Sequence, residues 1–339
     1  MEIDPRLAEE WDSLADRAGA APWMRPGWVA AWWKAFGSGE LELVAVRSEY
    51  GELTGVLPVA RRRGRVSALA NWHSPELPLT AAEGMTATLL EKLLAARPRS
   101  AAFRFPADDA AAAIGIAAGT AGYRLLDRVA ERSPYVDVAG SFEDYLATLD
   151  RHHVKETLRR RRRLGDEGEV EFSVEDGREH LDELLAEGLP VEASGWKRES
   201  GTAIDSQAET LGFYTEVARW AAARGILRLA FLRLGGRAIA FELALEDNGV
   251  YAILKGGFDV ELRKFGPGGL ITYEQLARAF ELGLRRYEFL GTDETYKTVW
   301  TPLAHERRVL QAFAPTPAGF VERAAFEHGR PLAKRLLRR

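Results

Sequence analysis

The stretch Arg263-Lys264-Phe265-Gly266-Pro267-Gly268-Gly269 stands between a predicted strand at 250–255 and a predicted helix at 270–284. Its glycines have no Cβ atom, so the backbone can turn there and approach a ligand closely. A helix N-terminus adds unpaired N–H groups and a partial positive charge, which together favour phosphates. Pro267 lacks only its own N–H, and Arg263 and Lys264 add charge at the mouth. The stretch therefore predicts a phosphate-binding loop, although a plain strand-to-helix turn uses the same residue types.

The elements around this loop follow an order that occurs in both halves of the chain. Hydrophobic periodicity predicts helices in the first half at 5–18, 27–36 and 85–96, and strands at 41–47, 56–62, 66–72 and 101–105. In the second half it predicts helices at 207–224 and 270–284, and strands at 227–234, 237–245, 250–255 and 287–290. The sequence thus predicts an α/β (α+β) fold of two domains, 1–140 and 141–339. Each would hold a mixed, mainly antiparallel sheet flanked by helices.

The composition sets limits on the class of protein. The 339 residues are enough for two domains of roughly 150 residues each, and 46% hydrophobic with 28% charged residues is an ordinary globular balance. A net charge of −4 argues against a surface that binds polyanions throughout, and the absence of cysteine excludes disulfides, thiolate zinc sites and cysteine nucleophiles. We find neither a secretory signal pattern nor an apolar run of ~20 residues, so we expect a cytoplasmic protein. The histidines lack metal-binding spacing, so we expect no metal.

The loop has the spacing of a known family motif. Arg263, Gly266 and Gly268 match the pyrophosphate motif of the GNAT acyltransferase superfamily, Arg/Gln-x-x-Gly-x-Gly/Ala at the start of a helix. Further segments resemble a two-domain bacterial branch of that superfamily: 196–203 (WKRESGTA), 213–214 (FY), 236–240 (GRAIA) and 291–300 (GTDETYKTVW). This branch is associated with cellulose biosynthesis and is related in fold to the Fem-type peptidyl transferases. The resemblance covers roughly residues 130–315 well and the earlier part more loosely.

This resemblance implies tandem GNAT-like domains and an N-acyltransferase. Acyl-CoA would be the co-substrate, with the residues from Arg263 to Gly269 around its pyrophosphate. The acyl group, acetyl or longer, would pass to an amine by direct attack without a covalent enzyme intermediate. The corresponding stretch of the first half, 72–78 (WHSPELP), lacks glycines and basic residues, so we expect the cofactor in the second domain only. Phe265 occupies a position where many relatives carry a small polar residue. Backbone N–H groups would still bind the pyrophosphate, so this difference matters little.

Acyl transfer from a thioester needs a neutral amine, an oxyanion stabiliser and a proton for the leaving thiolate. Glu242 stands in an apolar strand, where burial would raise its pKa and make it a candidate base. The alternative is a side chain on the solvent-facing side of that strand. Gly256 and Gly257 would disrupt the strand ladder between Lys255 and Phe258, which would free backbone N–H groups for the oxyanion.

Further candidates follow the predicted strand at 287–290. Tyr296 would protonate the thiolate, Asp293 would accept from the amine, and Lys297 would hold an anionic group of the substrate. The plainer interpretation of this segment is a helix start that is capped by Thr292 or Asp293.

Three residues are candidates for the acceptor pocket, namely Trp196, Lys197 and Lys255. An ordinary half-buried tryptophan is equally consistent with the sequence at position 196. The acceptor itself, a sugar amine, an amino acid or a peptide, stays open at this stage.

The densest positive run is 151–163 (RHHVKETLRRRRR), which we predict to be a helix with a thin apolar seam and a basic outer face. Arg159–Arg163 would bind tRNA if the protein were a Fem-type aminoacyl transferase that uses aminoacyl-tRNA. The acidic stretch 166–171 directly after it favours a solvated helix with balanced charge. A third hypothesis is a degenerate GNAT domain that serves as a binding or scaffold module.

Overall fold

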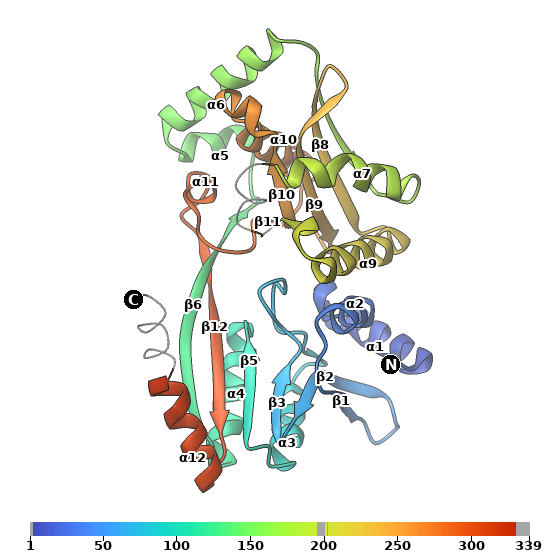
Figure 1. Ribbon diagram of the computed structural model, residues 1–339, viewed down its shortest axis with the longest axis vertical. Helices are drawn as coiled ribbons and strands as arrows, with labels where there is room; N and C mark the ends of the chain where they lie inside the picture. Colours follow the sequence, from blue (N-terminus) through green and yellow to red (C-terminus); the bar gives the residue numbers. More distant parts are fainter. Residues whose placement is uncertain (1–2, 195–200, 202, 330–339) are drawn as a thin grey trace. The chain divides into compact units, whose positions relative to one another are not determined.

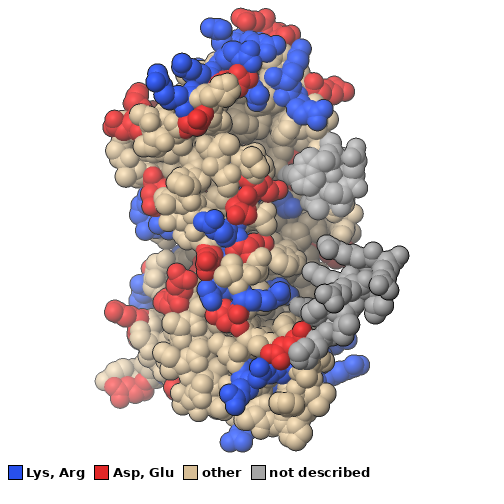
Figure 2. Space-filling view, turned by 90° about the vertical axis from the view of Figure 1, so that its left-hand side faces the viewer, with Lys and Arg blue, Asp and Glu red and all other residues tan. Residues whose placement is uncertain are grey.

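The computed structural model describes residues 3–194, 201 and 203–329, and Figure 1 shows the course of the chain. Across this described part, no helix combines the length and the apolar character needed to cross a membrane. Acidic and basic side chains are interspersed over the face seen in Figure 2, as the small net charge of −4 leads us to expect.

The chain divides into two compact units. The first is formed by residues up to Ala130 and from Arg307 onward, and the second by Glu131–Glu306. Two strands, β6 (Arg124–Asp137) and β12 (Ala304–Phe313), each run from one unit into the other. This division differs from the predicted boundary near Gly140. A boundary is recognised in a sequence by the composition of a linker, and a strand that passes from one unit to the other does not have that composition.

The first unit is built on a mostly antiparallel sheet. Its strand order is β1 (Glu40–Arg47), β2 (Leu53–Arg62), β3 (Arg65–Ala68), β5 (Ser100–Arg104) and β12, and β4 (Thr80–Ala81) pairs with β2. Only β3 and β5 are parallel among these described pairs. The helices are α1 (Pro5–Ala18), α2 (Pro26–Phe36), α3 (Thr86–Ala95), α4 (Asp108–Thr120) and α12 (Pro317–Ala324), with short helical segments at η1 (Pro22–Met24) and η4 (Ala325–Gly329). The core forms where Leu90 of α3 packs with strand residues such as Val59 and Phe103.

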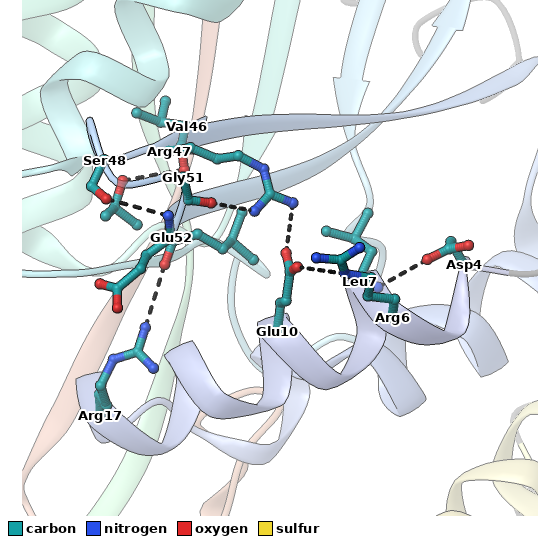
Figure 3. Close-up of polar contacts among 12 residues, drawn as sticks. Asp4, Arg6, Leu7, Glu10, Arg17, Val46, Arg47, Ser48, Gly51 and Glu52 are labelled. Atoms are coloured by element: carbon teal, nitrogen blue, oxygen red, sulfur yellow. Dashed lines mark hydrogen bonds and ion pairs between the residues drawn. The ribbon is translucent and has the colours of Figure 1, made fainter.

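Polar contacts orient α1 against the hairpin of β1 and β2 (Figure 3). Arg47 donates to Glu10 at 2.6 Å, and Arg17 donates to the Leu53 carbonyl at 3.4 Å. Exposed ion pairs contribute little to stability. The buried face of α1, which includes Trp11, therefore holds the helix in place, and the polar pairs fix its direction.

The second unit has a sheet in the order β6, β11 (Arg286–Glu288), β10 (Val250–Phe258), β9 (Arg237–Asp247), β8 (Leu227–Leu234) and β7 (Val170–Glu175). Its strands pair antiparallel except β10 and β11, which are parallel. The helices are α5 (Phe142–Thr148), α6 (Arg151–Gly165), α7 (Leu181–Glu192), α9 (Ala208–Arg224), α10 (Pro267–Glu281) and α11 (Thr295–Thr298), with short helical segments at η2 (Ile204–Ser206) and η3 (Val260–Phe265). The predicted fold class, mixed and mainly antiparallel sheets flanked by helices, is confirmed.

Helices cover both faces of this second sheet. Phe241 of β9 points toward α7, where its ring lies against Gly188. Its neighbour Ala240 points to the other face and shares a buried cluster with Leu270 of α10, because successive strand residues alternate. Leu164 of α6 belongs to the same cluster. The basic helix α6 therefore lies on the same side of the sheet as the helix that follows the predicted phosphate loop.

Gly188 approaches β9 so closely that an added Cβ atom would stand 2.4 Å from the Phe241 ring. Gly188→Ala should destabilise the protein by roughly 1–3 kcal/mol, because the buried ring has to move. Gly212 of α9 is the matched control, since it is exposed and an added Cβ atom meets nothing within 4 Å. Gly212→Ala should stabilise by about 0.5–1 kcal/mol through a smaller entropy of the unfolded chain. Urea unfolding measures both changes, and equal stability of the two variants would contradict the close contact.

Candidate active site

The strands β10 and β11 separate after a short parallel pairing. Val250, Tyr251 and Ala252 lie opposite Arg286, Tyr287 and Glu288. β10 then continues to Phe258, whereas β11 ends where this pairing ends. The chain stays beside β6 at Phe289, which donates its N–H to the Pro134 carbonyl at 3.1 Å, and it leaves the extended conformation at Leu290, whose φ is +51°. Within the described chain, no β11 residue pairs with positions 253–258 of β10.

Two glycines let the part of β10 beyond its pairing with β11 pass between the side chain of Glu242 and the backbone of Glu192. The register with β9 shifts just before Lys255, which marks a β-bulge. A Cβ atom on Gly256 would lie 3.3 Å from Cγ of Glu242, and one on Gly257 would lie 2.5 Å from Cα of Glu192. Because successive residues alternate, the two glutamates lie on opposite faces of the sheet. The ladder is disrupted before Lys255 and not at the two glycines, which stay in register with β9. The use of this segment for an oxyanion stays a prediction.

The helix α10 begins at Pro267, and its first turn lies beside the end of β10. Gly266 holds the N-cap position with a φ of +65°, a conformation that glycine adopts without strain. A Cβ atom on Gly268 would come within 2.9 Å of the Phe258 ring, so a side chain at this position would require the ring to shift. Gly269 is exposed. Since Gly266 has no side chain with which to cap the turn, the first N–H groups of α10 can bind a ligand.

Cationic side chains gather around the start of α10. Nη1 of Arg160, which belongs to α6, lies 2.7 Å from the place that a Cβ atom on Gly266 would take. The buried Phe265 ring has the guanidinium of Arg163 at 5.7 Å and the ammonium of Lys264 at 4.6 Å from its centroid. The remaining predicted loop cation, Arg263, is exposed. Figure 2 shows Lys and Arg side chains gathered near the upper end of the face in view, where α6 lies.

Sequence reasoning gave Arg160 a role only in the possible tRNA-binding run Arg159–Arg163, because it placed Leu158 in the apolar seam of this helix. Thr157 and Leu164 are the buried residues of α6, whereas Leu158 is exposed. Residues three or four positions apart lie on one side of a helix, so Arg160 shares the face of Thr157 and Leu164. The sequence feature that could have indicated this face is Leu164, an apolar residue four positions after Arg160.

The charge of α6 is balanced in part within the helix itself. Glu156 accepts hydrogen bonds from Arg159 and Arg160 at 2.8 Å each, and these bonds lower the pKa of Glu156 to about 2. The acidic stretch after the helix supplies a looser pair, Glu167 with Lys264 at 4.0 Å. Glu156 thus holds Arg160 in a fixed direction next to Gly266.

Glu242 of β9 is a buried carboxyl group on the α10 face of the sheet. It is 4% exposed and lies in register with two small residues, Ala230 of β8 and Gly256 of β10. The Tyr251 hydroxyl donates to its Oε2 at 3.2 Å. Burial raises the pKa of Glu242 to about 7, and the hydrogen bond from Tyr251 opposes part of this rise. The solvent-facing interpretation of Glu242 is therefore wrong, and its role as a base stays a prediction.

Lys297 is 6% exposed, and its ammonium binds the loop that precedes it. Nζ donates to the carbonyls of Leu290 at 2.9 Å and Thr292 at 3.0 Å, and it pairs with Glu294 at 2.9 Å. These contacts fix the loop 290–294 after β11. They give Lys297 a positioning role, whereas the anion-binding role expected from the sequence stays untested.

The same loop carries Asp293 and leads into Tyr296, both of which are exposed; Tyr296 is 60% exposed. Desolvation of the hydroxyl, the Glu294 carboxylate and, least of the three, Glu242 raise the pKa of Tyr296. Glu294 holds the N-cap position of α11, where the sequence suggested Thr292 or Asp293.

The α7 face of β10 carries a second polar group. Nζ of Lys255 lies 5.4 Å from the ring centroid of Tyr214, and burial together with Glu192 raises the pKa of Tyr214. The buried Glu192 accepts the N–H of Ile204 at 2.9 Å, which ties the end of α7 to η2. Sequence reasoning missed Glu192, because nothing in its local pattern shows that Gly257 packs on it. The other acceptor candidates, Trp196 and Lys197, lie outside the described residues.

Comparison with known proteins identifies the second unit. Residues 151–298 match the family described as "Acetyltransferase (GNAT) domain", so this part of the chain is a GNAT domain, as the resemblance implied. No curated protein matches the chain in sequence. The predicted association with cellulose biosynthesis stays a prediction.

Several solved structures share the fold of the whole chain. They include FemX (13% identity, TM-score 0.60, 91% of this chain and 96% of that one), L-PGS from Bacillus licheniformis (14%, 0.55, 100% and 98%) and a conserved protein of unknown function from Bacteroides thetaiotaomicron (11%, 0.58, 92% and 98%). At such low identity these structures establish the fold and leave the activity to be argued from the site.

The raised pKa of Glu242 predicts that this group destabilises the fold as the pH rises. Its ordinary value is 4.5, so the folded state keeps a proton that the unfolded chain releases between 4.5 and about 7. Below that window this group makes its full contribution to the free energy of unfolding. As the pH rises through the window, the free energy of unfolding falls by up to about 3 kcal/mol. Glu242→Gln removes the effect. In urea unfolding, the free energy of unfolding of the variant minus that of the wild type should rise between about pH 5 and about pH 8. A difference that does not change with pH would contradict the raised pKa.

Proposed function

We propose that the GNAT domain at residues 151–298 transfers an acyl group, acetyl or longer, from acyl-CoA to an amine acceptor. The observation that carries this proposal is the separation of β10 from β11 beside a helix N-terminus whose cap is glycine. An acyl-CoA has amide groups along its arm and a pyrophosphate behind them. The segment of β10 beyond its pairing with β11 would lie beside the arm, and the first turn of α10 offers N–H groups for the pyrophosphate.

The charges around the loop support a polyphosphate ligand. Gly268 lets the Phe258 ring pack against the first turn of α10, and Arg263 and Lys264 stand at the mouth of the loop. Arg160 and Arg163 of α6 add guanidinium groups, which form paired hydrogen bonds with phosphate oxygens more readily than an ammonium does. Two elements that are far apart in the sequence therefore supply cations to one turn.

The expected reaction needs no covalent enzyme intermediate. The Glu242 carboxylate takes a proton from the acceptor ammonium, with Asp293 as a second acceptor for the amine, and the amine nitrogen attacks the thioester carbonyl carbon. The C–N bond forms, and N–H groups at 256–258 stabilise the oxygen that becomes negative. When the C–S bond breaks, the second proton of the nitrogen reaches the thiolate by way of Tyr296. The products are the amide and the CoA thiol, and the proton on Glu242 returns to solvent.

The acceptor would enter on the α7 face of β10. Lys255 stands there beside Tyr214, and Glu192 holds the ends of the segment that contains Trp196 and Lys197. We propose these residues as the acceptor side of the site and Lys297 as the residue that keeps Tyr296 in place.

A second candidate function uses another donor at the same site. The exposed cations of α6, which include Arg151, Lys155 and Arg162, exceed what one pyrophosphate needs, and a nucleic acid would use them. The resemblance to Fem-type transferases implies aminoacyl-tRNA as that donor. Arg160 and Gly266 favour the compact pyrophosphate, since they bring charge to the first turn of α10.

Arg160→Ala should weaken the binding of acetyl-CoA about 10-fold, because one charge-assisted hydrogen bond to phosphate contributes roughly 1.5 kcal/mol. Arg162→Ala is the matched control, since it removes an exposed arginine of the same helix for which no contact with the loop is seen in the described chain. It should change the affinity less than about 2-fold. Isothermal titration calorimetry measures both constants, and an equal loss in the two variants would show that only the overall charge of α6 matters.

Direct tests separate the three hypotheses. If the wild-type protein does not bind any acyl-CoA, the proposed donor is wrong. Binding of tRNA that weakens with salt and is lost when Arg159–Arg163 are neutralised would support the Fem-type alternative. Binding of CoA without turnover of any amine would support a degenerate domain that serves as a binding module.

A further inference from the structure

The helix α12 of the first unit, which follows β12 (Figure 1), turns apolar side chains to solvent. Four of its residues are exposed, and all four are apolar: Pro317, Ala318, Phe320 and Val321. Phe320 is 71% exposed and Val321 is 67% exposed. A helix on the surface of a globular protein ordinarily presents its polar side chains to water. The exposed apolar face of α12 therefore indicates a surface that binds something apolar.

Glu322 holds α12 in this orientation. Its carboxylate pairs with Arg65 at 2.7 Å and with Arg99 at 2.8 Å, and it accepts a hydrogen bond from Oγ of Ser100 at 2.9 Å. Successive residues of a helix are turned by roughly 100°, so Phe320 stands on the side opposite Glu322. The polar side of the helix is thus bound to the first unit, and the apolar side faces outward.

Arginines from two loops lie beside the helix that Glu322 anchors. Arg65 follows the turn between β2 and β3, and Arg99 ends the loop between α3 and β5. The N–H of Arg99 donates to the Gly64 carbonyl at 2.7 Å, which joins the two loops. Three exposed arginines at these loops form no ion pair within the described chain: Arg62, Arg63 and Arg97. Cations therefore flank the apolar face of α12.

Two of these arginines adopt a left-handed backbone conformation. The angle φ is +51° at Arg63 and +49° at Arg97. Glycine or asparagine would form such turns with less strain, since most other residues rarely enter this region. Strained backbone of this kind is retained mainly at positions that have a function. The two positions thus indicate a use for the positive charge.

The sequence after α12 and η4 continues the positive charge. Residues 330–339 contain no acidic residue, and they lie outside the described residues. Five of them are basic: Arg330, Lys334, Arg335, Arg338 and Arg339. The exposed apolar helix is therefore both flanked and followed by cations, which complement an anionic partner.

We propose that α12 and the arginines of the two loops form a docking surface for a membrane that contains anionic phospholipids. Phe320 and Val321 enter the boundary between the headgroups and the acyl chains, as the apolar face of an interfacial helix does. The three exposed arginines lie against the lipid phosphates, with their methylene groups near the apolar region. Stable attachment to a membrane surface takes two signals, and this surface combines apolar area with positive charge.

The mixture of side chains favours a lipid surface over other occupants. A nucleic acid would bind the arginines through its phosphates and would leave Phe320 and Val321 in water. A second copy of the chain, related by a two-fold axis, would bring the same arginines close together, and like charges repel. An anionic membrane serves both kinds of side chain, because its phosphates lie directly above its acyl chains.

Co-sedimentation with vesicles tests the apolar part of the surface. The wild type should bind vesicles made of equal parts of phosphatidylcholine and phosphatidylglycerol, and should not bind phosphatidylcholine alone. Phe320→Ser should weaken the binding at least about 10-fold, because the ring no longer leaves water. Tyr50→Ser is the matched control, since it removes an aromatic ring that is 85% exposed in the turn between β1 and β2, at the other end of β2 from Arg62. It should change the binding less than about 2-fold.

The same vesicles test the charged part of the surface. Arg63→Asn and Arg97→Asn should each weaken the binding about 5-fold, because each removes one cation next to the lipid phosphates. Asparagine tolerates the left-handed conformation, so these variants keep the backbone. Arg6→Gln, which removes an exposed cation of α1, is the control and should change the binding less than about 2-fold.

A fluorescent label locates the surface that enters the membrane. The chain has no cysteine, so a single introduced cysteine carries the label at one position. With an environment-sensitive fluorophore, the emission of Val321→Cys should rise and shift to the blue when the mixed vesicles are added. The emission of labelled Tyr50→Cys should stay unchanged.

Failure of the wild type to bind the mixed vesicles would overturn the proposal, as would equal losses in Phe320→Ser and Tyr50→Ser. An unchanged emission of labelled Val321→Cys on vesicles that bind the protein would also overturn it. Binding of RNA that Arg63→Asn weakens and Phe320→Ser leaves intact, without binding of vesicles, would assign the surface to a nucleic acid instead. Self-association that Phe320→Ser abolishes, again without binding of vesicles, would assign it to a second copy of the chain.

Discussion

The separation of β10 from β11 is the constraint on which the rest of the site depends. The two strands pair over Tyr251 and Tyr287 and then part, although β10 lies in the interior of its sheet. Backbone N–H and C=O groups inside a protein need partners, and β10 keeps β9 as a partner along the stretch where β11 has left it. The bulge before Lys255 and the two glycines after it follow from this geometry. They let β10 continue between Glu242 on one face and Glu192 on the other.

The electrostatics of the site come from elements that the chain brings together from distant positions. The first turn of α10 provides N–H groups, while α6 provides Arg160 and Arg163 from about 100 residues earlier in the sequence. The burial of Leu164 holds α6 in this position, and Glu156 directs Arg160 toward Gly266. The basic run therefore places Arg160 and Arg163 beside this turn, although its local sequence suggested a solvated helix.

Local features of the site were predictable from the sequence, and features that depend on packing were not. The loop from Arg263 to Gly269 is local, because its glycines and the helix after it occupy one continuous stretch. The contact of Arg160 with Gly266 depends on how α6 rotates, and that of Glu192 with Gly257 depends on how α7 lies on the sheet. The predicted strand at 287–290 proved shorter, because Leu290 adopts a positive φ that leucine rarely takes.

We propose above all that the segment of β10 beyond its pairing with β11 and the first turn of α10 bind an acyl-CoA. Hydrogen–deuterium exchange with and without saturating acetyl-CoA tests it most directly, since it reports on backbone N–H groups. We expect slower exchange at residues 253–258 and 266–270, with smaller changes along β8 and β9. Unchanged exchange in these two segments, or protection confined to other parts of the chain, would contradict the account.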